Sequence, residues 1–494
     1  MKRRDFIFNI SLLIFLNLLI KPFWILGIDV EVQNQVGAES YGLYFALFNF
    51  TILFNMLLDM GITNYNSRNI AQNTQLLSKH LSHILTLKFS LGILYFIVTL
   101  IAALIVGYQG YQLKLLLWMS LNQFLNALIL YLRSNVSALL KFKTDSFLSV
   151  IDKVIMVILC SILLWGNTST SAFKIEWFIA SQTLAYLITA LLALFIVLRN
   201  SGAFRLYWNF SFFKVLLKRS FPFAILYLLM ACYNRFDSVM LERLLPEGVG
   251  AYQAGIYASA FRLLDAVVMI AYLFSVILLP LFSKMLKNRE NIVPIVESAF
   301  QLLFYYSTTV VVLLIFNAEA IFSFLYDHHV AESVRVFPIL ITCLIPISMI
   351  YIFGTLLTAY GSLRLLNITS LLGIFVNIGI NFFLIPHLHA RGAAIASLST
   401  QTIVAISQIY LAFRALHIPL RKKICLSCVF YITLLIPIAY GVSYYWDEKV
   451  WVALLIGGVL SFILAFFTQL LPFSFIRELV VDKLKQTTAA RRSR

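Results

Sequence analysis

The sequence predicts an all-α polytopic membrane protein, on three observations. Hydrophobic residues make up 61% of the 494 residues and charged residues 12%, with a mean hydropathy of +0.90, whereas soluble domains are nearer half apolar and a quarter charged. Apolar runs of about 20 residues, long enough to cross a hydrocarbon core of about 30 Å, recur along the whole chain. One stretch also occurs twice. We therefore expect about 14 transmembrane helices, arranged as two pseudo-symmetric six-helix lobes plus a C-terminal helix pair.

The repeated stretch is VGAESYGLYFALF at 36–48 and VGAYQAGIYASAF at 249–261, which lie 213 positions apart. The identities are Val36/Val249, Gly37/Gly250, Ala38/Ala251, Gly42/Gly255, Tyr44/Tyr257 and Phe48/Phe261. This period is too long for a solenoid and is typical of a duplicated membrane carrier with a site between its lobes. Chance similarity between two apolar helices is the alternative, but hydrophobicity alone does not require the matched glycines and tyrosine.

The apolar runs place the helices near 6–28, 42–63, 83–106, 112–139, 149–166, 175–198, 221–241, 251–281, 294–316, 334–360, 365–386, 392–413, 424–445 and 450–472. The first run follows three basic residues, as in a signal peptide, but it is too long for a signal core and no small-residue cleavage site follows it. We therefore expect it to span the membrane. The predicted divisions are an N-lobe (1–199, helices 1–6), a C-lobe (214–414, helices 7–12), helices 13–14 (422–472) and a basic cytoplasmic tail (473–494).

The basic residues predict the orientation. With the N-terminus inside, the inside segments hold 26 Lys and Arg and the outside segments hold 6, as the positive-inside rule requires. Both termini are then cytoplasmic, and the net charge of +17 forms a rim that faces anionic lipid. No nucleic-acid partner is predicted.

Few motifs point to bound groups. Cys425 and Cys428 form a CxxC, but this opens an apolar helix without a second cysteine pair, so we predict no metal or redox site. The sequence has no P-loop with GK[ST], which argues against an ATP-driven pump. We predict no catalytic residue and no cofactor, and a secondary carrier fits best.

Six basic residues lie within the predicted helices: Lys21, Lys88, Arg133, Lys153, Arg235 and Arg262. Acids at membrane depth are Asp59, Asp237 and Asp265, with Asp152 near an interface. Because a charge at the bilayer centre costs roughly 2.5–3.5 kcal/mol, each should face a partner or water.

The basic residues fall into three groups. Lys88 and Lys153 are expected to snorkel to the cytoplasmic edge. Arg262 lies three residues before Asp265, close enough to pair with it. The remaining three, Lys21, Arg133 and Arg235, are expected to face a cavity. No acid lies at helical spacing on the helices of Lys21 and Arg133, whereas one lies near Arg235.

Polar residues follow several helix faces. Thr51, Asn55, Asp59 and Thr63 step by four and predict one polar stripe. The other amides singled out are Asn122 and Asn126 in helix 4, Asn234 in helix 7, and Asn377 and Asn381 in helix 11. They either line a cavity or join helices through hydrogen bonds worth about 0.6 kcal/mol each.

Three stretches resemble a known family. They are VNIGINFFLIPHLHARGAAIASL at 376–398, NRFDSVMLERLLPEGVGAYQAGIYASAFRL at 234–263 and LLDMGITNYNSRNIA at 57–71. They are similar to the multidrug/oligosaccharidyl-lipid/polysaccharide (MOP) exporter superfamily, and within it to Wzx-type flippases of lipid-linked oligosaccharides. HLHARG departs from the pattern, since a glycine is usual in the middle of that loop, which affects the expected loop shape.

The resemblance implies translocation of an undecaprenyl-pyrophosphate-linked oligosaccharide across the bilayer of a bacterial inner membrane, with glycosyltransferases and a polysaccharide polymerase as partners. The resemblance implies that Lys21, Arg133, Arg235 and Arg262 bind the pyrophosphate and anionic sugars. It implies that Asp59, Asp237 and Asp265 balance these charges or couple transport to H⁺, Na⁺ or the membrane potential.

Two alternatives remain. One is a cation-coupled multidrug antiporter of the same superfamily, but such carriers usually have twelve helices and need acids, whereas here intramembrane basic residues outnumber acidic ones. The other is a membrane polysaccharide polymerase or ligase. That enzyme needs a catalytic outside loop, for which 317–333 is the only candidate, through Glu319, Asp327, His328, His329 and Glu332.

Overall fold

In the computed structural model nearly all of the described part of the chain is helical, and no strand occurs there. The described residues are 15–17, 19–63, 66, 70, 76–139, 141–166, 173–201, 208, 210–418, 421–446 and 449–471. The predicted tail 473–494 and the start of the first predicted helix lie outside them.

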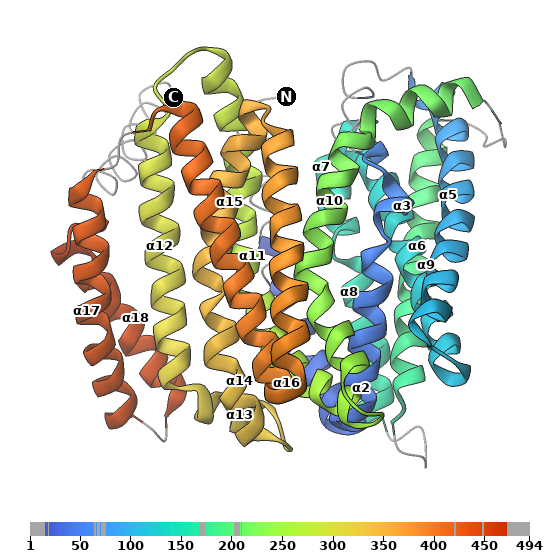
Figure 1. The fold of residues 1–494 in the computed structure, drawn as a ribbon. Helices are drawn as coiled ribbons and strands as arrows, with labels where there is room; N and C mark the ends of the chain where they lie inside the picture. The colour runs from blue at the N-terminus through green and yellow to red at the C-terminus, as the bar shows by residue number, and fades with distance from the viewer. Residues whose placement is uncertain are drawn as a thin grey trace, which may run out of the picture. The chain divides into compact units, whose positions relative to one another are not determined.

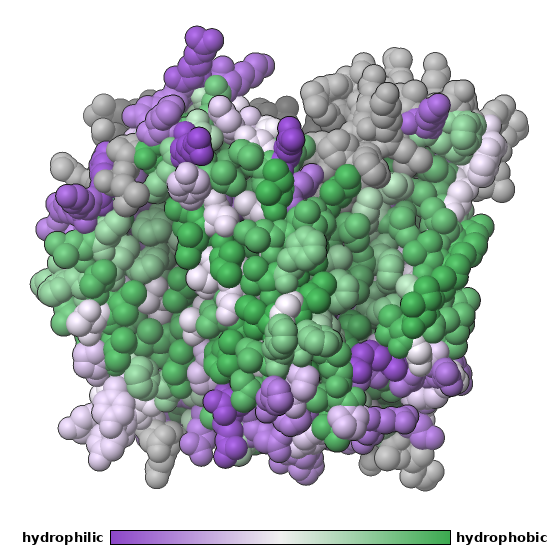
Figure 2. Space-filling model, in the orientation of Figure 1, coloured by the Kyte–Doolittle hydropathy of each residue, from purple (hydrophilic) through white to green (hydrophobic). Residues whose placement is uncertain are grey.

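Ten helices in this part are long and apolar enough to cross a membrane. Hydrophobic residues cover the middle of the face shown in Figure 2, and hydrophilic residues gather at its ends. Many large apolar side chains are exposed, including Ile105 and Phe467, as expected where lipid replaces water as the solvent. The prediction of a polytopic all-α membrane protein is confirmed.

The helices group into two compact units. Unit 1 is 1–266, 326–329 and 370–400; unit 2 is 267–325, 330–369 and 401–494. The two units are defined by contacts between residues, whereas the predicted lobes are defined by the sequence repeat. The division into lobes therefore stays a prediction.

The first complete helix of unit 1 is a π-helix, η1 (Trp24–Asp29), which starts two residues after Pro22, whose missing backbone N–H cannot continue the α-helical pattern. The other complete helices of unit 1 are α2 (Val30–Leu53), α3 (Met56–Asp59), α5 (Leu76–Val106), α6 (Gly110–Ala138), α7 (Phe142–Leu148), α8 (Ile151–Trp165), α9 (Ile175–Ser201) and α10 (Phe210–Leu244). Figure 1 shows most of them running up and down beside one another.

Unit 2 contains the pair predicted as helices 13 and 14. Its complete helices are α12 (Val293–Phe316), α13 (Ala318–Leu325), α14 (Val330–Thr342), α15 (Leu344–Tyr360), α17 (Lys422–Tyr445) and α18 (Val450–Phe467). Two further helices, α11 (Val249–Lys287) and α16 (Leu363–Leu416), contribute residues to both units.

The 54 residues of α16 would span about 80 Å at 1.5 Å per residue, far more than one membrane crossing needs. The helix changes direction at His389, whose φ of 51° and ψ of −131° are not helical. Its two halves therefore correspond to predicted helices 11 and 12. The loop that departs from the family pattern is the point where a non-glycine residue adopts a positive φ.

Predicted helix 2 (42–63) is not continuous. It breaks between the end of α2 and the short α3, and again at Met60 and Gly61, which both have positive φ (45° and 77°). The polar stripe predicted from steps of four therefore does not lie on one unbroken helix.

The repeated motif packs against itself in unit 1. A Cβ added to Gly42 of α2 would clash with the Ala251 carbonyl and the Gly255 amide of α11, and one added to Gly255 would clash with Ala38. Each copy thus supplies an alanine and a glycine four residues apart, a small-xxx-small pattern that lets membrane helices approach closely.

Candidate functional site

The charged side chains predicted to form a site all lie in unit 1, in several groups. The most enclosed group joins η1, α2 and α11. Arg262 Nε lies 2.6 Å from Asp29 Oδ2 and donates to the Tyr41 hydroxyl at 3.0 Å, and that hydroxyl donates to Asp29 Oδ2 at 2.8 Å. Gln33 donates to the Gly255 carbonyl at 3.0 Å. These contacts lie beside the point where α2 and α11 pack closely at Gly42 and Gly255.

A second arginine belongs to a looser group. Arg235 Nη1 of α10 lies 3.8 Å from Asp265 Oδ2 and donates to Asn49 Oδ1 at 3.4 Å, with its guanidinium 5.2 Å from the Phe261 ring centroid. The spacing of three residues would allow Arg262 to pair with Asp265, but these two residues do not pair with each other. Each of the two residues takes a partner from another helix, because helix packing brings η1 to Arg262 and α10 to Asp265.

Asp237 occupies a cage of neutral donors. Its side chain is 1% exposed. Asn377 and Asn381 of α16 donate to Oδ1 at 2.8 and 2.7 Å, and Tyr257 donates to Oδ2 at 2.9 Å. Within the described part of the chain no basic side chain pairs with Asp237, and Asn381 Oδ1 is buried without a hydrogen-bond partner. The cage therefore offers oxygen atoms and one unneutralised carboxylate.

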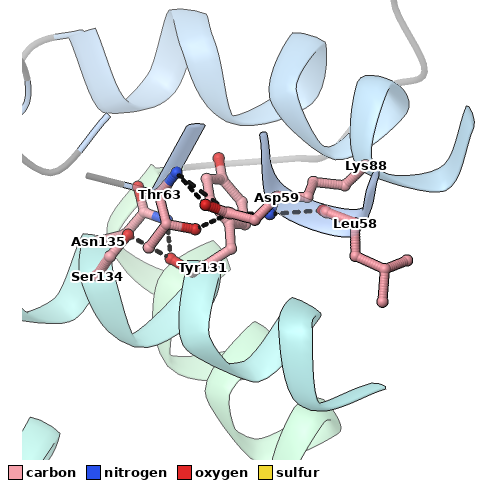
Figure 3. Close-up of polar contacts among 7 residues, drawn as sticks. All are labelled: Leu58, Asp59, Thr63, Lys88, Tyr131, Ser134 and Asn135. Atoms are coloured by element: carbon pink, nitrogen blue, oxygen red, sulfur yellow. Dashed lines mark hydrogen bonds and ion pairs between the residues drawn. The ribbon is translucent and has the colours of Figure 1, made fainter. Parts of the chain in front are cut away.

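Asp59 lies at the break of predicted helix 2 (Figure 3). Lys88 of α5 forms a short ion pair with it and donates to the Leu58 carbonyl at 3.0 Å, while the backbone N–H and hydroxyl of Thr63 donate to Asp59. The prediction that Lys88 snorkels to an edge is wrong, since it is 2% exposed. It instead compensates a carbonyl that the helix break would leave without a partner.

Another group of cations includes Lys21, Arg133 and Lys153. Arg133 Nε of α6 pairs with Asp145 of α7 at 2.9 Å. Lys153 of α8 lies 3.4 Å from Asp152, donates to the Tyr186 hydroxyl at 3.3 Å and lies over the Trp24 ring, so it also does not snorkel. Lys21 is within electrostatic range of Lys153, Asp152 and Arg133. It makes no hydrogen bond or ion pair with any described residue.

The remaining predicted amides have different surroundings. Asn55 donates to Gln123 at 3.0 Å, and Asn122 accepts from Thr183 at 2.7 Å. Asn234 donates to the Met230 carbonyl of its own helix at 2.8 Å. Asn126 is half-buried. The first two thus join helices, whereas Asn377 and Asn381 contact a candidate site residue.

The sequence interpretation missed two acids that matter. Asp29 lies one residue beyond the first predicted helix (6–28), and Asp145 lies between the predicted helices 112–139 and 149–166. With them counted, the charged groups described above contain six acidic residues (Asp29, Asp59, Asp145, Asp152, Asp237 and Asp265) beside the six basic ones. One available signal was that Glu242, an acid at the end of α10, lies 213 positions after Asp29.

This arrangement can hold an anion where a cation is unpaired or weakly paired, and a cation where a carboxylate is. Lys21 and Arg235 meet the first condition, and Asp237 meets the second. By contrast, Arg262 and Lys88 are each closely paired with one carboxylate and have little exposed surface to offer an anion.

The chain is similar in fold to several solved structures of transporters and flippases. The chain is similar to the inward closed conformation of the lipid II flippase MurJ, with a TM-score of 0.69 at 15% identity over 94% of this chain and 99% of that one. An inward-facing multidrug resistance transporter of the MATE family and MOP superfamily gives 0.63 at 16% identity over 80% and 94%. A MOP superfamily transporter from Pyrococcus furiosus gives 0.57 at 13% identity over 83% and 94%.

Among curated proteins, no sequence matches the chain. A family model does match, over residues 8–286, which is more than half of the chain. That span takes in η1 to α10 and nearly all of α11, and with them all the charged groups described above. The chain has the fold of the MOP superfamily transporters and belongs to the polysaccharide biosynthesis protein family.

Proposed function

We propose that this protein is a flippase that moves an undecaprenyl-pyrophosphate-linked oligosaccharide across the bacterial inner membrane by alternating access, with both termini in the cytoplasm. Membership of a polysaccharide biosynthesis family and the similarity in fold to a lipid II flippase support the lipid-linked saccharide as cargo. The carrying observation is Lys21, a cation at membrane depth without a counter-ion bound to it among the described residues.

Lys21 and Arg235 are the proposed first contacts for the pyrophosphate. Lys21 is a half-buried residue, and Coulomb attraction to a phosphate is stronger in such a position than in water. Arg235 is a quarter exposed and its contact with Asp265 is long, so a phosphate can displace that carboxylate and accept two N–H bonds from the guanidinium. Arg133 and Arg262 form short ion pairs with Asp145 and Asp29. They bind cargo only in a conformation in which those ion pairs are broken.

Asp237 is the proposed coupling site. A buried carboxylate without a cationic partner is costly, and a proton or a monovalent cation would neutralise it. The caged carboxylate and the orphaned Asn381 Oδ1 are oxygen ligands of the kind that hard cations prefer. Asp59 and Asp265 already have basic partners and are proposed to balance charge.

The test is complementation in a strain that lacks this protein. Lys21→Gln and Arg235→Gln are each expected to abolish surface polysaccharide at normal protein level, and lipid-linked single repeat units should accumulate on the cytoplasmic side. Lys287→Gln, at the exposed end of α11, is the matched control and should support normal synthesis. Undiminished polysaccharide in both site variants would remove these residues from the mechanism.

The same strain separates the alternatives. Repeat units trapped on the periplasmic side would indicate the polymerase, and drug resistance on overexpression without any effect on polysaccharide would indicate the antiporter. For coupling, Asp237→Asn should make transport in vesicles insensitive to an imposed Na⁺ or H⁺ gradient, whereas gradient-dependent transport in that variant would refute the assignment of Asp237.

A further inference from the structure

A pocket of about 540 Å³ lies in unit 2, where α12 and α17 begin and α18 ends. Its lining residues are Pro294, Glu297, Ser298, Gln301, Arg421, Lys423, Ile424, Ser427, Phe466, Gln469 and Leu471. No sequence motif pointed to it, and it is separate from the charged groups of unit 1.

The charges around the pocket sum to one positive charge. Arg421 Nε pairs with Glu297 Oε1 at 2.8 Å, which neutralises both groups. Lys423 is exposed and has no acidic partner in the described ranges. An anion that enters the pocket therefore meets one uncompensated ammonium group, with a guanidinium beside it.

Neutral donors and helix ends favour the same kind of ligand. The side chains of Gln301, Ser427 and Gln469 make no hydrogen bond to any residue that the structure describes, so their donors are available. The first turns of α12 and α17 both contribute to the lining, and helix N-termini carry partial positive charge. The pocket is thus suited to an oxyanion.

The pocket is also amphipathic and lies beside lipid-facing surface. Pro294, Ile424, Phe466 and Leu471 form its apolar part. Close to these residues in the sequence, Leu426 of α17 is 71% exposed and Phe467 of α18 is 81% exposed, as expected for side chains that contact acyl chains. The neighbouring segments 282–293 and 414–423 are among those that the positive-inside rule predicts to be cytoplasmic.

We propose that this pocket binds the phosphodiester head group of an anionic phospholipid, such as phosphatidylglycerol, in the leaflet at that end of unit 2. A phosphodiester carries one negative charge, which matches the single uncompensated positive charge of the lining. A diphosphate carries more, and Glu297 opposes the excess. The bound lipid would hold the start of α17 against α12 and α18.

The test uses the full chain purified in detergent and stripped of lipid, with lipid binding followed by native mass spectrometry. Phosphatidylglycerol is expected to bind more tightly than phosphatidylcholine. Lys423→Gln should weaken phosphatidylglycerol binding about fivefold, which corresponds to the roughly 1 kcal/mol that one basic residue near an anionic surface contributes. Lys422→Gln is the matched control: Lys422 is exposed on the same turn but does not line the pocket, so binding should not change.

A second variant probes the cavity without changing charge. Ser427→Leu should reduce phosphatidylglycerol binding by filling the pocket while the thermal unfolding midpoint of the lipid-free protein stays unchanged. Equal losses in the Lys422 and Lys423 variants, or equal binding of both lipids, would overturn the proposal.

Two competitors identify the source of the phosphate group. Displacement of phosphatidylglycerol by inorganic phosphate would assign the pocket to a soluble anion, and tighter binding of undecaprenyl diphosphate would assign it to the proposed cargo; either result overturns the phospholipid assignment. Because these are binding measurements, their outcome is distinct from the complementation test of transport.

Discussion

At the scale of single residues, several charges of unit 1 are stabilised in pairs that join different helices. Arg262 finds Asp29, more than 200 positions earlier, and Lys88 finds Asp59 across a helix break. A buried ion pair contributes little net stability over an apolar pair, but removal of one partner leaves an uncompensated charge. Single substitutions should therefore be far more damaging than double ones.

Lys88→Met is expected to lower the free energy of unfolding by about 3 kcal/mol, since it leaves the Asp59 carboxylate and the Leu58 carbonyl without their partner. Thermal unfolding in detergent measures the effect. The double variant Lys88→Met/Asp59→Asn should recover much of the loss, and Lys287→Met should be neutral. If the double variant were no more stable than the single one, the ion pair with Asp59 would not be the way in which Lys88 stabilises the protein.

Tyr41→Phe removes a hydroxyl that accepts from Arg262 and donates to Asp29 but leaves the ion pair intact. Hydrogen bonds to charged groups are worth about 1.5–3 kcal/mol, so we expect a destabilisation of about 2 kcal/mol. Tyr410→Phe, at a side chain that is 60% exposed, is the control and should change the unfolding midpoint little. Equal midpoints for the two variants would mean that the Tyr41 hydroxyl contributes nothing.

At the scale of elements, two backbone features decide how helices meet. Gly42 and Gly255 allow α2 and α11 to touch, so the repeat detected in the sequence is also a contact surface. His389 allows α16 to change direction, but at a φ that favours glycine. The glycines suit the close approach of α2 and α11, whereas His389 is strained by the backbone conformation that the bend in α16 requires.

Gly42→Ala is expected to destabilise the protein by about 1–3 kcal/mol, because the added methyl group forces the α2 and α11 backbones apart. Gly379→Ala is the matched control. A Cβ there would meet nothing within 4 Å, and alanine should stabilise that helix by up to about 1 kcal/mol. Thermal unfolding of the pair should shift in opposite directions, and a shift in the same direction would rule out close packing at Gly42.

His389→Gly should raise the free energy of unfolding by about 1 kcal/mol by relieving a positive φ. His387→Gly, two residues earlier at an exposed helical position, should lower it by about 1 kcal/mol through the poor helix propensity of glycine. Calorimetry or a fluorescence-based thermal assay would separate the two signs. Destabilisation in both variants would mean that His389 makes a compensating contact.

At the scale of the whole molecule, the band of hydrophobic surface and the lengths of the apolar helices establish a membrane protein. The proposed orientation follows from the distribution of basic residues between the loops. The segments with most Lys and Arg are predicted to face the cytoplasm because insertion retains positive charge on that side. The orientation also decides which leaflet supplies the lipid at the unit 2 pocket.

Cysteine labelling tests the orientation. In a cysteine-free background, Arg391→Cys should react with a membrane-impermeant maleimide in intact cells, whereas Lys287→Cys should react only after the membrane is opened. Both side chains are exposed. The reverse pattern would invert the topology and place the lipid pocket in the outer leaflet of the membrane.

The sequence alone determined the membrane class, the sites of most helices and the repeat, because hydropathy and its period are local properties that a run of 20 residues already carries. It did not determine the break at Met60 and Gly61, since the Lys88 side chain that compensates it comes from the next helix. Nor did it predict that Arg262 pairs with Asp29 rather than with Asp265 three residues away. Such pairings depend on distances between helices, which only the tertiary structure decides, and they determine which cations remain available to bind cargo.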